Sequence, residues 1–267
     1  MSARPVPSPD RDPTVVRLED LPPGAPPVFG DLSDFFNPFL PHFVRATLHG
    51  GGEVWAARSG STFDGLLLYN EVERVGSIFT RSPTVAQVLF GLKEHVALFS
   101  DFPLAGHTEV YHVFRADRLG DGPAHQFAHP VRLARAGDQP AIVRLMKEMY
   151  GRIDPNWLPV VPSAEEKCVV VEVSGEIVGT AWVTVVNGQG RLHSLSVRPH
   201  YWRMGIGTDL WHARILWARR AGARQVLSEI ADQNVASQAI ATAGGMRKVG
   251  QLFLSYRPTE APVPRSD

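Results

Sequence analysis

The segment best suited to chemistry is a glycine-containing turn between an expected strand and an expected helix. The strand, residues 191–197, leads through Pro199 into Arg203-Met204-Gly205-Ile206-Gly207-Thr208. Glycine lets a backbone approach a ligand closely, and the free amides of a first helical turn, together with the helix dipole, attract anions. This arrangement predicts an anion site, for which a pyrophosphate is the usual ligand.

The spacing of the two glycines argues against two common nucleotide sites. A phosphate loop would continue with Gly-Lys and Ser or Thr, and a dinucleotide-binding turn would carry a third glycine where Leu210 stands. Neither a nucleoside triphosphate nor NAD is therefore an expected ligand.

Regular elements must hold this turn in place, and their signals surround it. Val131–Arg135 alternates like a strand, and Asp138 is suited to cap a helix with Pro140 in its first turn. The tight-turn dipeptides Ser174-Gly175 and Asn187-Gly188 separate three apolar runs. Those runs predict an antiparallel meander over Cys168–Val173, Ile177–Val186 and Arg191–Val197.

After the glycine turn, apolar residues recur at helical spacing. The helix is expected to run to about Arg220 with Gly222 as its C-cap, and a strand is expected at Val226–Ile230. The apolar face consists of Ile206, Leu210, Ala213 and Trp217. We expect Arg214, Arg219 and Arg220 to form a solvated face of this helix.

Segments of the first half recur in order in the second half at a nearly constant offset. Val16-Arg17-Leu18 is matched by Val131-Arg132-Leu133, and Arg74–Ile78 by Arg191–Leu195. This predicts a duplicated unit, with chance similarity among strand-rich segments as the alternative. The expected organisation is a flexible tail (1–13), a first domain (14–118), a linker (119–130), a second domain (131–258) and a flexible tail (259–267).

Composition limits the class of protein. The 267 residues carry 27 Lys and Arg against 27 Asp and Glu, so no basic excess favours nucleic acid or an anionic membrane. One cysteine excludes an intrachain disulfide and a cysteine-rich zinc site, and no apolar run approaches the roughly 20 residues of a membrane span. The polar, proline-rich start lacks the core of a signal peptide. We expect a cytoplasmic protein with no metal site, and we expect His125 and His129 to lie in a solvated linker.

The second half resembles the GNAT N-acetyltransferases. Leu195-x-Val197-x-Pro199 followed by Arg203-Met204-Gly205-Ile206-Gly207 and Leu210 resembles the acetyl-CoA loop of that family. Asn234, Ala239, Ile240 and Gly245-Met246 resemble its second cofactor segment, with Met246 in place of an aromatic residue. The resemblance covers about Val131–Arg257 and implies an α/β protein (an α+β mixed sheet) with a tandem GNAT-like acyl-CoA N-acyltransferase fold.

The first half lacks the cofactor loop. After Ile78 it continues with Thr80-Arg81-Ser82-Pro83-Thr84, which contains no Gly-x-Gly. We therefore interpret residues 14–118 as a degenerate GNAT-like domain that walls the substrate cleft. The alternative is an unrelated small α+β domain.

The resemblance implies acetyl-CoA as a co-substrate. Its pantetheine arm would lie in a splay of the sheet beside Leu195, Ser196 and Val197, and its pyrophosphate would lie on the amides of Arg203, Met204, Gly205, Ile206, Gly207 and Thr208. Trp202 replaces the Gln or Arg that usually begins the loop, which leaves the backbone amides in place. Asn234 would hydrogen-bond the pantetheine or a bridging water, or cap a helix, and these roles are compatible.

The resemblance also implies direct attack of an amine on the thioester, with a base to take its proton. His193 is the first candidate, expected in register with Leu195 and Val197, and its ordinary pKa near 6.5 suits a base at neutral pH. The alternative is a structural histidine. Glu229, on the strand across the splay, is the second candidate, with a surface carboxylate as its alternative. Ala241 stands where the family often has a Tyr as general acid, so another group serves, the thiolate leaves unaided, or the domain does not catalyse.

The function expected is transfer of an acetyl group from acetyl-CoA to a primary amine of a small molecule or peptide. The alternative is a non-catalytic tandem protein that binds acyl-CoA or a partner protein. Neither nucleic acid nor membrane is an expected partner, and both a monomer and a homodimer stay open.

Overall fold

The structure is a computed structural model that describes residues 13–18, 29–59, 62–94, 96–104, 106–119, 125–150 and 165–257. Its elements follow nearly the same order twice. The first half contains β1 (Thr14–Leu18), η1 (Asn37–Phe39), α1 (Leu40–His49), β2 (Glu53–Ser59), β3 (Thr62–Asn70), β4 (Val75–Thr80), α2 (Pro83–Phe90), β5 (Val96–Ser100) and β6 (His107–Ala116). The second half contains β7 (Val131–Leu133), η2 (Ala136–Asp138), α3 (Gln139–Tyr150), β8 (Glu166–Val173), β9 (Glu176–Val186), β10 (Gln189–Val197), η4 (Pro199–Tyr201), α4 (Ile206–Arg220), β11 (Gln225–Ala231), α5 (Val235–Ala243) and β12 (Arg247–Arg257).

The predicted meander of the second half is present as β8, β9 and β10. The turns that join these strands are two-residue turns in which Ser174, Gly175, Asn187 and Gly188 all have positive φ, between 51° and 81°. Such turns match the right-handed twist of an antiparallel pair. In the first half, the described residues between β5 and β6 contain no helix.

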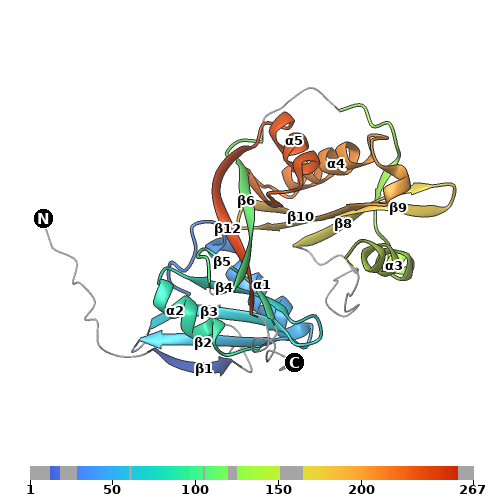
Figure 1. The fold of residues 1–267 in the computed structure, drawn as a ribbon. Coiled ribbons are helices and arrows are strands. Elements are labelled where there is room, and N and C mark those ends of the chain that lie inside the picture. Colours follow the sequence, from blue (N-terminus) through green and yellow to red (C-terminus); the bar gives the residue numbers. More distant parts are fainter. Residues whose placement is uncertain are drawn as a thin grey trace, which may run out of the picture.

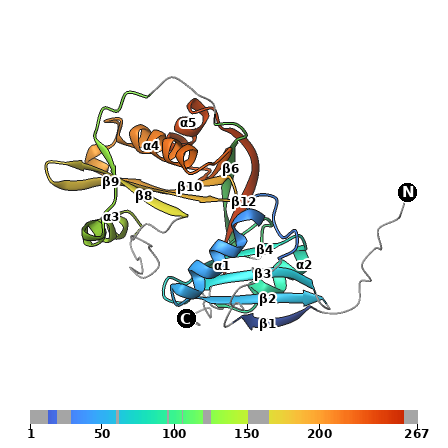
Figure 2. The same ribbon diagram turned by 180° about the vertical axis from the view of Figure 1, so that it is seen from behind.

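The twelve strands form one sheet in the order β1-β2-β3-β4-β5-β12-β6-β11-β10-β9-β8-β7. In this order the last strand of each half lies in the other half: β6 pairs with β11, and β12 pairs with β5. The two exchanged strands also pair with each other, and they run between the halves in both views (Figures 1 and 2). Pulling the halves apart would expose unpaired edges on β5 and β11, so the exchange fixes the halves together.

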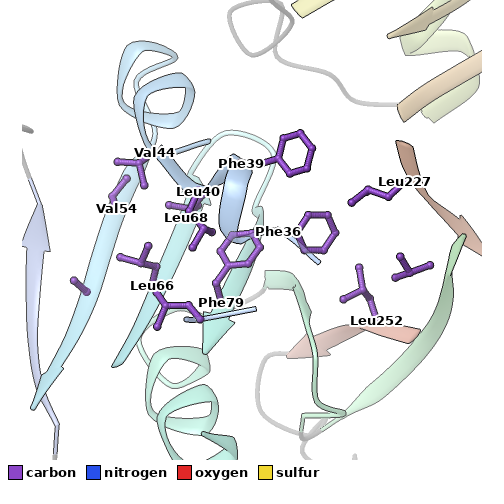
Figure 3. Packing of buried hydrophobic residues seen from close by; sticks show 13 residues of the cluster. Phe36, Phe39, Leu40, Val44, Val54, Leu66, Leu68, Phe79, Leu227 and Leu252 are labelled. Atoms are coloured by element: carbon purple, nitrogen blue, oxygen red, sulfur yellow. The ribbon is translucent and has the colours of Figure 1, made fainter. Parts of the chain in front are cut away.

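A shared hydrophobic core adds to this link. Phe36 and Phe39 of the first half are 4% and 0% exposed, and they pack in one cluster with Leu227 on β11 and Leu252 on β12. Figure 3 shows the two leucines on strands that face the phenylalanines. The core of the first half thus extends into the second half.

Helices cover both faces of the second half of the sheet. α4 and α5 lie over one face, where Leu192 and Val183 pack against Trp211, and α3 lies against the other, where Trp182 packs against Ile142 (Figure 1). Because side chains alternate along a strand, His193 lies on the α3 face. None of the described helices combines the length and apolarity needed to cross a membrane.

Candidate functional site

A fork in the sheet opens between β10 and β11. The two strands pair in parallel only from Gln189 and Gln225 to Arg191 and Leu227. Beyond that point β10 keeps its pairing with β9 as far as Val197. The β11-facing edge of residues 192–197 therefore has no strand partner among the described residues, which gives an extended ligand a backbone edge to bind.

A β-bulge interrupts β10 beside the fork. Ser194 has φ 52°, and the register with β9 shifts between His193 and Ser196. As a result Leu195 packs toward α4, whereas His193 and Ser196 both face α3. The expectation that His193 is in register with Leu195 and Val197 is therefore wrong, and the bulge is the reason.

The glycine turn presents backbone to solvent at the start of α4. Arg203 and Gly205 have φ of 63° and 87°, and residues 202–205 are exposed, while Ile206 is 1% exposed and anchors the turn. In the part of the chain that the structure describes, no side chain caps the helix at Gly205. Gly207 has ordinary clearance, with a built Cβ 3.5 Å from Ile240 Cδ1. Amides at a helix start that are exposed and uncapped fit an anionic group such as a pyrophosphate.

The linker is fastened to this turn rather than solvated. Asp209, 2% exposed in the first turn of α4, lies 2.7 Å from His125 Nε2 and 2.8 Å from His129 Nδ1. Its carboxylate also accepts hydrogen bonds from the backbone amides of Ala128 and His129. Burial alone would raise the pKa of Asp209, but these hydrogen bonds outweigh it and hold the pKa below its usual range. The expectation for His125 and His129 is thus corrected, because a buried carboxylate far along the chain supplies their partner.

His193 lies in a buried polar cluster at the bulge. Its Nε2 lies 3.0 Å from both Glu166 Oε1 and Thr184 Oγ1, and its Nδ1 lies 3.2 Å from Ser194 Oγ. Burial, helped by the nearby charge of Arg191, lowers the pKa of His193 below 6.5. Burial acts to raise the pKa of Glu166, but hydrogen bonds to His193 and Thr184 bring it below its usual value. At neutral pH the pair is a neutral imidazole beside a carboxylate.

Glu229, the other predicted catalytic residue, lies in the same charged cluster but in an ion pair. Arg191 Nε donates to Glu229 Oε1 at 3.0 Å across β10 and β11. The guanidinium of Arg191 lies over the ring of Phe43, 5.2 Å from its centroid. The first half thus forms one side of the cluster.

A second contribution of the first half is His42 on α1. Its Nδ1 lies 2.8 Å from Glu165 Oε2, next to Glu166 in the chain. Sequence analysis missed Glu166, Thr184 and His42. Their roles depend on pairing between distant segments, and no local pattern marks them.

The segment that begins at Asn234 forms the expected helix, α5. Asn234 caps this helix, with Oδ1 accepting from the Ser237 amide at 3.1 Å, so its predicted capping role is present. Ala241 is 1% exposed and packs with Trp211 and Ile230. Its methyl group offers no acid.

Arg214 departs from the expected solvated helix face. Arg220 is exposed and Arg219 is half-buried, but Arg214 is 3% exposed. The signal was available in the sequence, because Arg214 follows Leu210 by one helical turn and therefore lies on the apolar stripe.

Part of the chain matches a known family. Residues 140–244 match the model of the acetyltransferase (GNAT) family. No curated protein matches the chain in sequence.

Solved structures with a similar fold include three GNAT proteins. A GCN5-related N-acetyltransferase from Sphaerobacter thermophilus is 16% identical with a TM-score of 0.56, covering 79% of this chain and 82% of that one. A GCN5-related N-acetyltransferase from Kribbella flavida is 13% identical with a TM-score of 0.51, covering 73% and 87%. A tandem GNAT protein from the clavulanic acid biosynthesis pathway is 14% identical with a TM-score of 0.50, covering 79% and 84%. The fold is therefore that of GNAT proteins, a tandem GNAT protein among them, and residues 140–244 match the model of the acetyltransferase (GNAT) family.

Proposed function

We propose that the protein is an N-acetyltransferase that moves an acetyl group from acetyl-CoA to a primary amine. One relationship carries the proposal. The open edge of β10 joins the anion-binding turn at Gly205–Thr208 to the His193–Glu166 pair at the bulge. A single strand thus connects a place for the phosphates of the co-substrate with a base for the amine.

Different residues of the chain would bind different parts of acetyl-CoA. The backbone amides from Arg203 to Thr208 would hold the pyrophosphate, and the edge of Leu195, Ser196 and Val197 would pair with the amides of the pantetheine arm. Asn234 would face the same arm from the start of α5. Bound acetyl-CoA supplies the activated acyl group.

His193 is proposed as the base. Its Nε2–H would donate to Glu166, which fixes the tautomer and leaves the Nδ1 lone pair as the acceptor; Ser194 Oγ, 3.2 Å from Nδ1, would relay the proton of the substrate ammonium to it. Because burial lowers the pKa of His193, the imidazole is neutral and able to accept a proton at pH 7. Glu229 is the weaker candidate, since Arg191 already occupies its carboxylate.

Calorimetric titration of acetyl-CoA into Gly207→Glu tests the cofactor half of the proposal. The site has room for a Cβ, so the variant places an anion in the turn without the strain that a positive φ would impose. Gly137→Glu is the matched control, because it adds the same charge where a Cβ meets nothing within 4 Å. Binding by the wild type and the control, with loss in Gly207→Glu, supports the proposal. A folded wild type that does not bind overturns it.

The reaction is tested by screening small-molecule and peptide amines for release of free CoA, with His193→Ala as the comparison. Amine-dependent release that falls roughly 10²-fold or more in the variant supports the assignment of the base. A non-catalytic acyl-CoA-binding protein is the second candidate. Ala241 favours it, because an alanine in the position of the usual general acid cannot donate a proton. Tight binding with no release from any amine would favour that candidate.

A further inference from the structure

The narrow end of the fork is closed by two side chains that donate to β10. Ser228 Oγ on β11 donates to the carbonyl oxygen of Leu192 at 2.7 Å. Arg214 Nη1 on α4 donates to the carbonyl oxygen of His193 at 3.4 Å, a long and weak hydrogen bond. The guanidinium of Arg214 therefore lies where β10 and β11 separate, next to the bulge.

The charge of Arg214 has no counterion among the residues that the structure describes. Arg214 is 3% exposed. Among the described residues it forms no ion pair, and its Nε has no hydrogen-bond partner. Burial lowers the pKa of Arg214 to about 9, which still leaves the group charged at neutral pH. A buried cation without a partner is strongly unfavourable, and it becomes favourable when an anion arrives beside it.

The proposed reaction creates an anion at this place. With the phosphates on the turn and the pantetheine along β10, the thioester would reach the bulge at His193, which the Arg214 guanidinium contacts. Ala241, in the position of the usual acid, cannot stabilise a thiolate. The hydroxyl of Tyr150 on α3 accepts a hydrogen bond from Ser196 Oγ at 3.1 Å, and Tyr150 lies near enough to Arg214 for its charge to raise the pKa of the guanidinium, against the larger effect of burial.

We propose that Arg214 is a catalytic residue that stabilises the departing CoA thiolate, an inference that rests on the proposed function. After a proton has passed from the ammonium to His193, the amine lone pair forms a bond to the carbonyl carbon of the thioester. The nitrogen of the new C–N bond is positively charged, and its extra proton passes to solvent water. The C–S bond breaks, and its electron pair goes to sulfur. The guanidinium donates hydrogen bonds to the sulfur anion and keeps its own protons, so the amide and the thiolate are the products.

The thiol of bound CoA tests this without any amine substrate. The wild type saturated with CoA is titrated from pH 6 to 10 while the ultraviolet absorbance of the thiolate is followed, and the complex with desulfo-CoA is subtracted. Cys168 does not interfere, because burial raises the pKa of its thiol to about 12. A cation in contact shifts a pKa by about 1–3 units, so the bound thiol should titrate that far below the free one.

Variants distinguish the effect of the Arg214 charge on the thiol from an effect on folding. Arg214→Met should return the thiol to the pKa of free CoA, Arg214→Lys should keep part of the shift, and Arg220→Met, an exposed arginine on the same helix, should change nothing. Binding of desulfo-CoA to each variant reports that the site is intact, and Arg214→Gln replaces Arg214→Met if the latter does not bind.

Either of two results would overturn this inference and leave the proposed function standing. One is a bound thiol that titrates like free CoA in the wild type, and the other is a lowered thiol pKa that persists in Arg214→Met. Failure of both CoA and desulfo-CoA to bind the folded wild type overturns the proposed function and this inference with it.

Discussion

The carboxylate of Asp209 accepts a hydrogen bond from the backbone amide of His129 at 3.0 Å and lies 2.8 Å from Nδ1 of the same histidine. This contact fastens the linker between the halves to the first turn of α4. It also places the ring of His129 beside the glycine turn, with Cε1 4.0 Å from a Cβ built on Gly205. The linker thus supports the turn that would bind the phosphates.

Replacing Asp209 should loosen this attachment. Asp209→Ala should lower the free energy of unfolding by about 1.5–3 kcal/mol, since it removes hydrogen bonds to a buried charged group. The pKa of Asp209 is below its unfolded value, so its contribution is present above about pH 4 and is lost as the pH falls through the folded pKa. Urea unfolding of both proteins at pH 7 and pH 3 measures this. An equal difference in stability at both pH values would contradict the assignment.

The activity should depend on the ionisation of His193 in a defined direction. Because the pKa of His193 is lowered, the acid limb of kcat/KM should have its midpoint below about 6.5, with full activity above it. Glu166→Gln removes a carboxylate that favours the imidazolium, and it should move the midpoint further down. Initial rates between pH 5 and 8 decide this, and a midpoint that rises in the variant would refute the pairing.

Cys168 should resist thiol reagents in the folded protein. It is 1% exposed, it lies 3.1 Å from Thr180 Oγ1, and burial raises its pKa to about 12. At pH 8 the reactive thiolate is scarce, and the sulfur is covered by the packing of α3. Mass spectrometry after alkylation should show no label without denaturant and one label in urea, because the chain has one cysteine. Rapid labelling without denaturant would show that α3 does not cover β8.

Gly244 should not tolerate a side chain. A Cβ built there lies 2.0 Å from Trp211 Cη2, so Gly244→Ala forces α4 and α5 apart. We expect a loss of about 1–3 kcal/mol in the free energy of unfolding, as for other overpacked sites. Gly137→Ala, where a Cβ meets nothing within 4 Å, is the control, and thermal unfolding of both variants checks the difference. Equal melting temperatures would refute the close packing.

The local elements of the second half follow from sequence alone. Alternation of apolar and polar residues predicts the strands, and Asn187-Gly188 predicts the tight turn between β9 and β10. The spacing of Ile206 and Leu210 predicts α4. The Gly-x-Gly turn of the second half, and the lack of such a sequence after Ile78 in the first half, are also local features that the sequence shows directly. Each of these signals depends on residues within a few positions of one another, where steric and turn preferences act.

Only the tertiary structure decided which residues meet in the site. Exchange of β6 and β12 between the halves, attachment of His129 to Asp209 and pairing of Glu166 with His193 all join residues far apart in the chain. The bulge at Ser194 turned His193 away from the face expected for it, and the approach of α4 to the fork buried Arg214. Such contacts depend on burial and register set by the whole sheet, and local sequence preferences do not specify them.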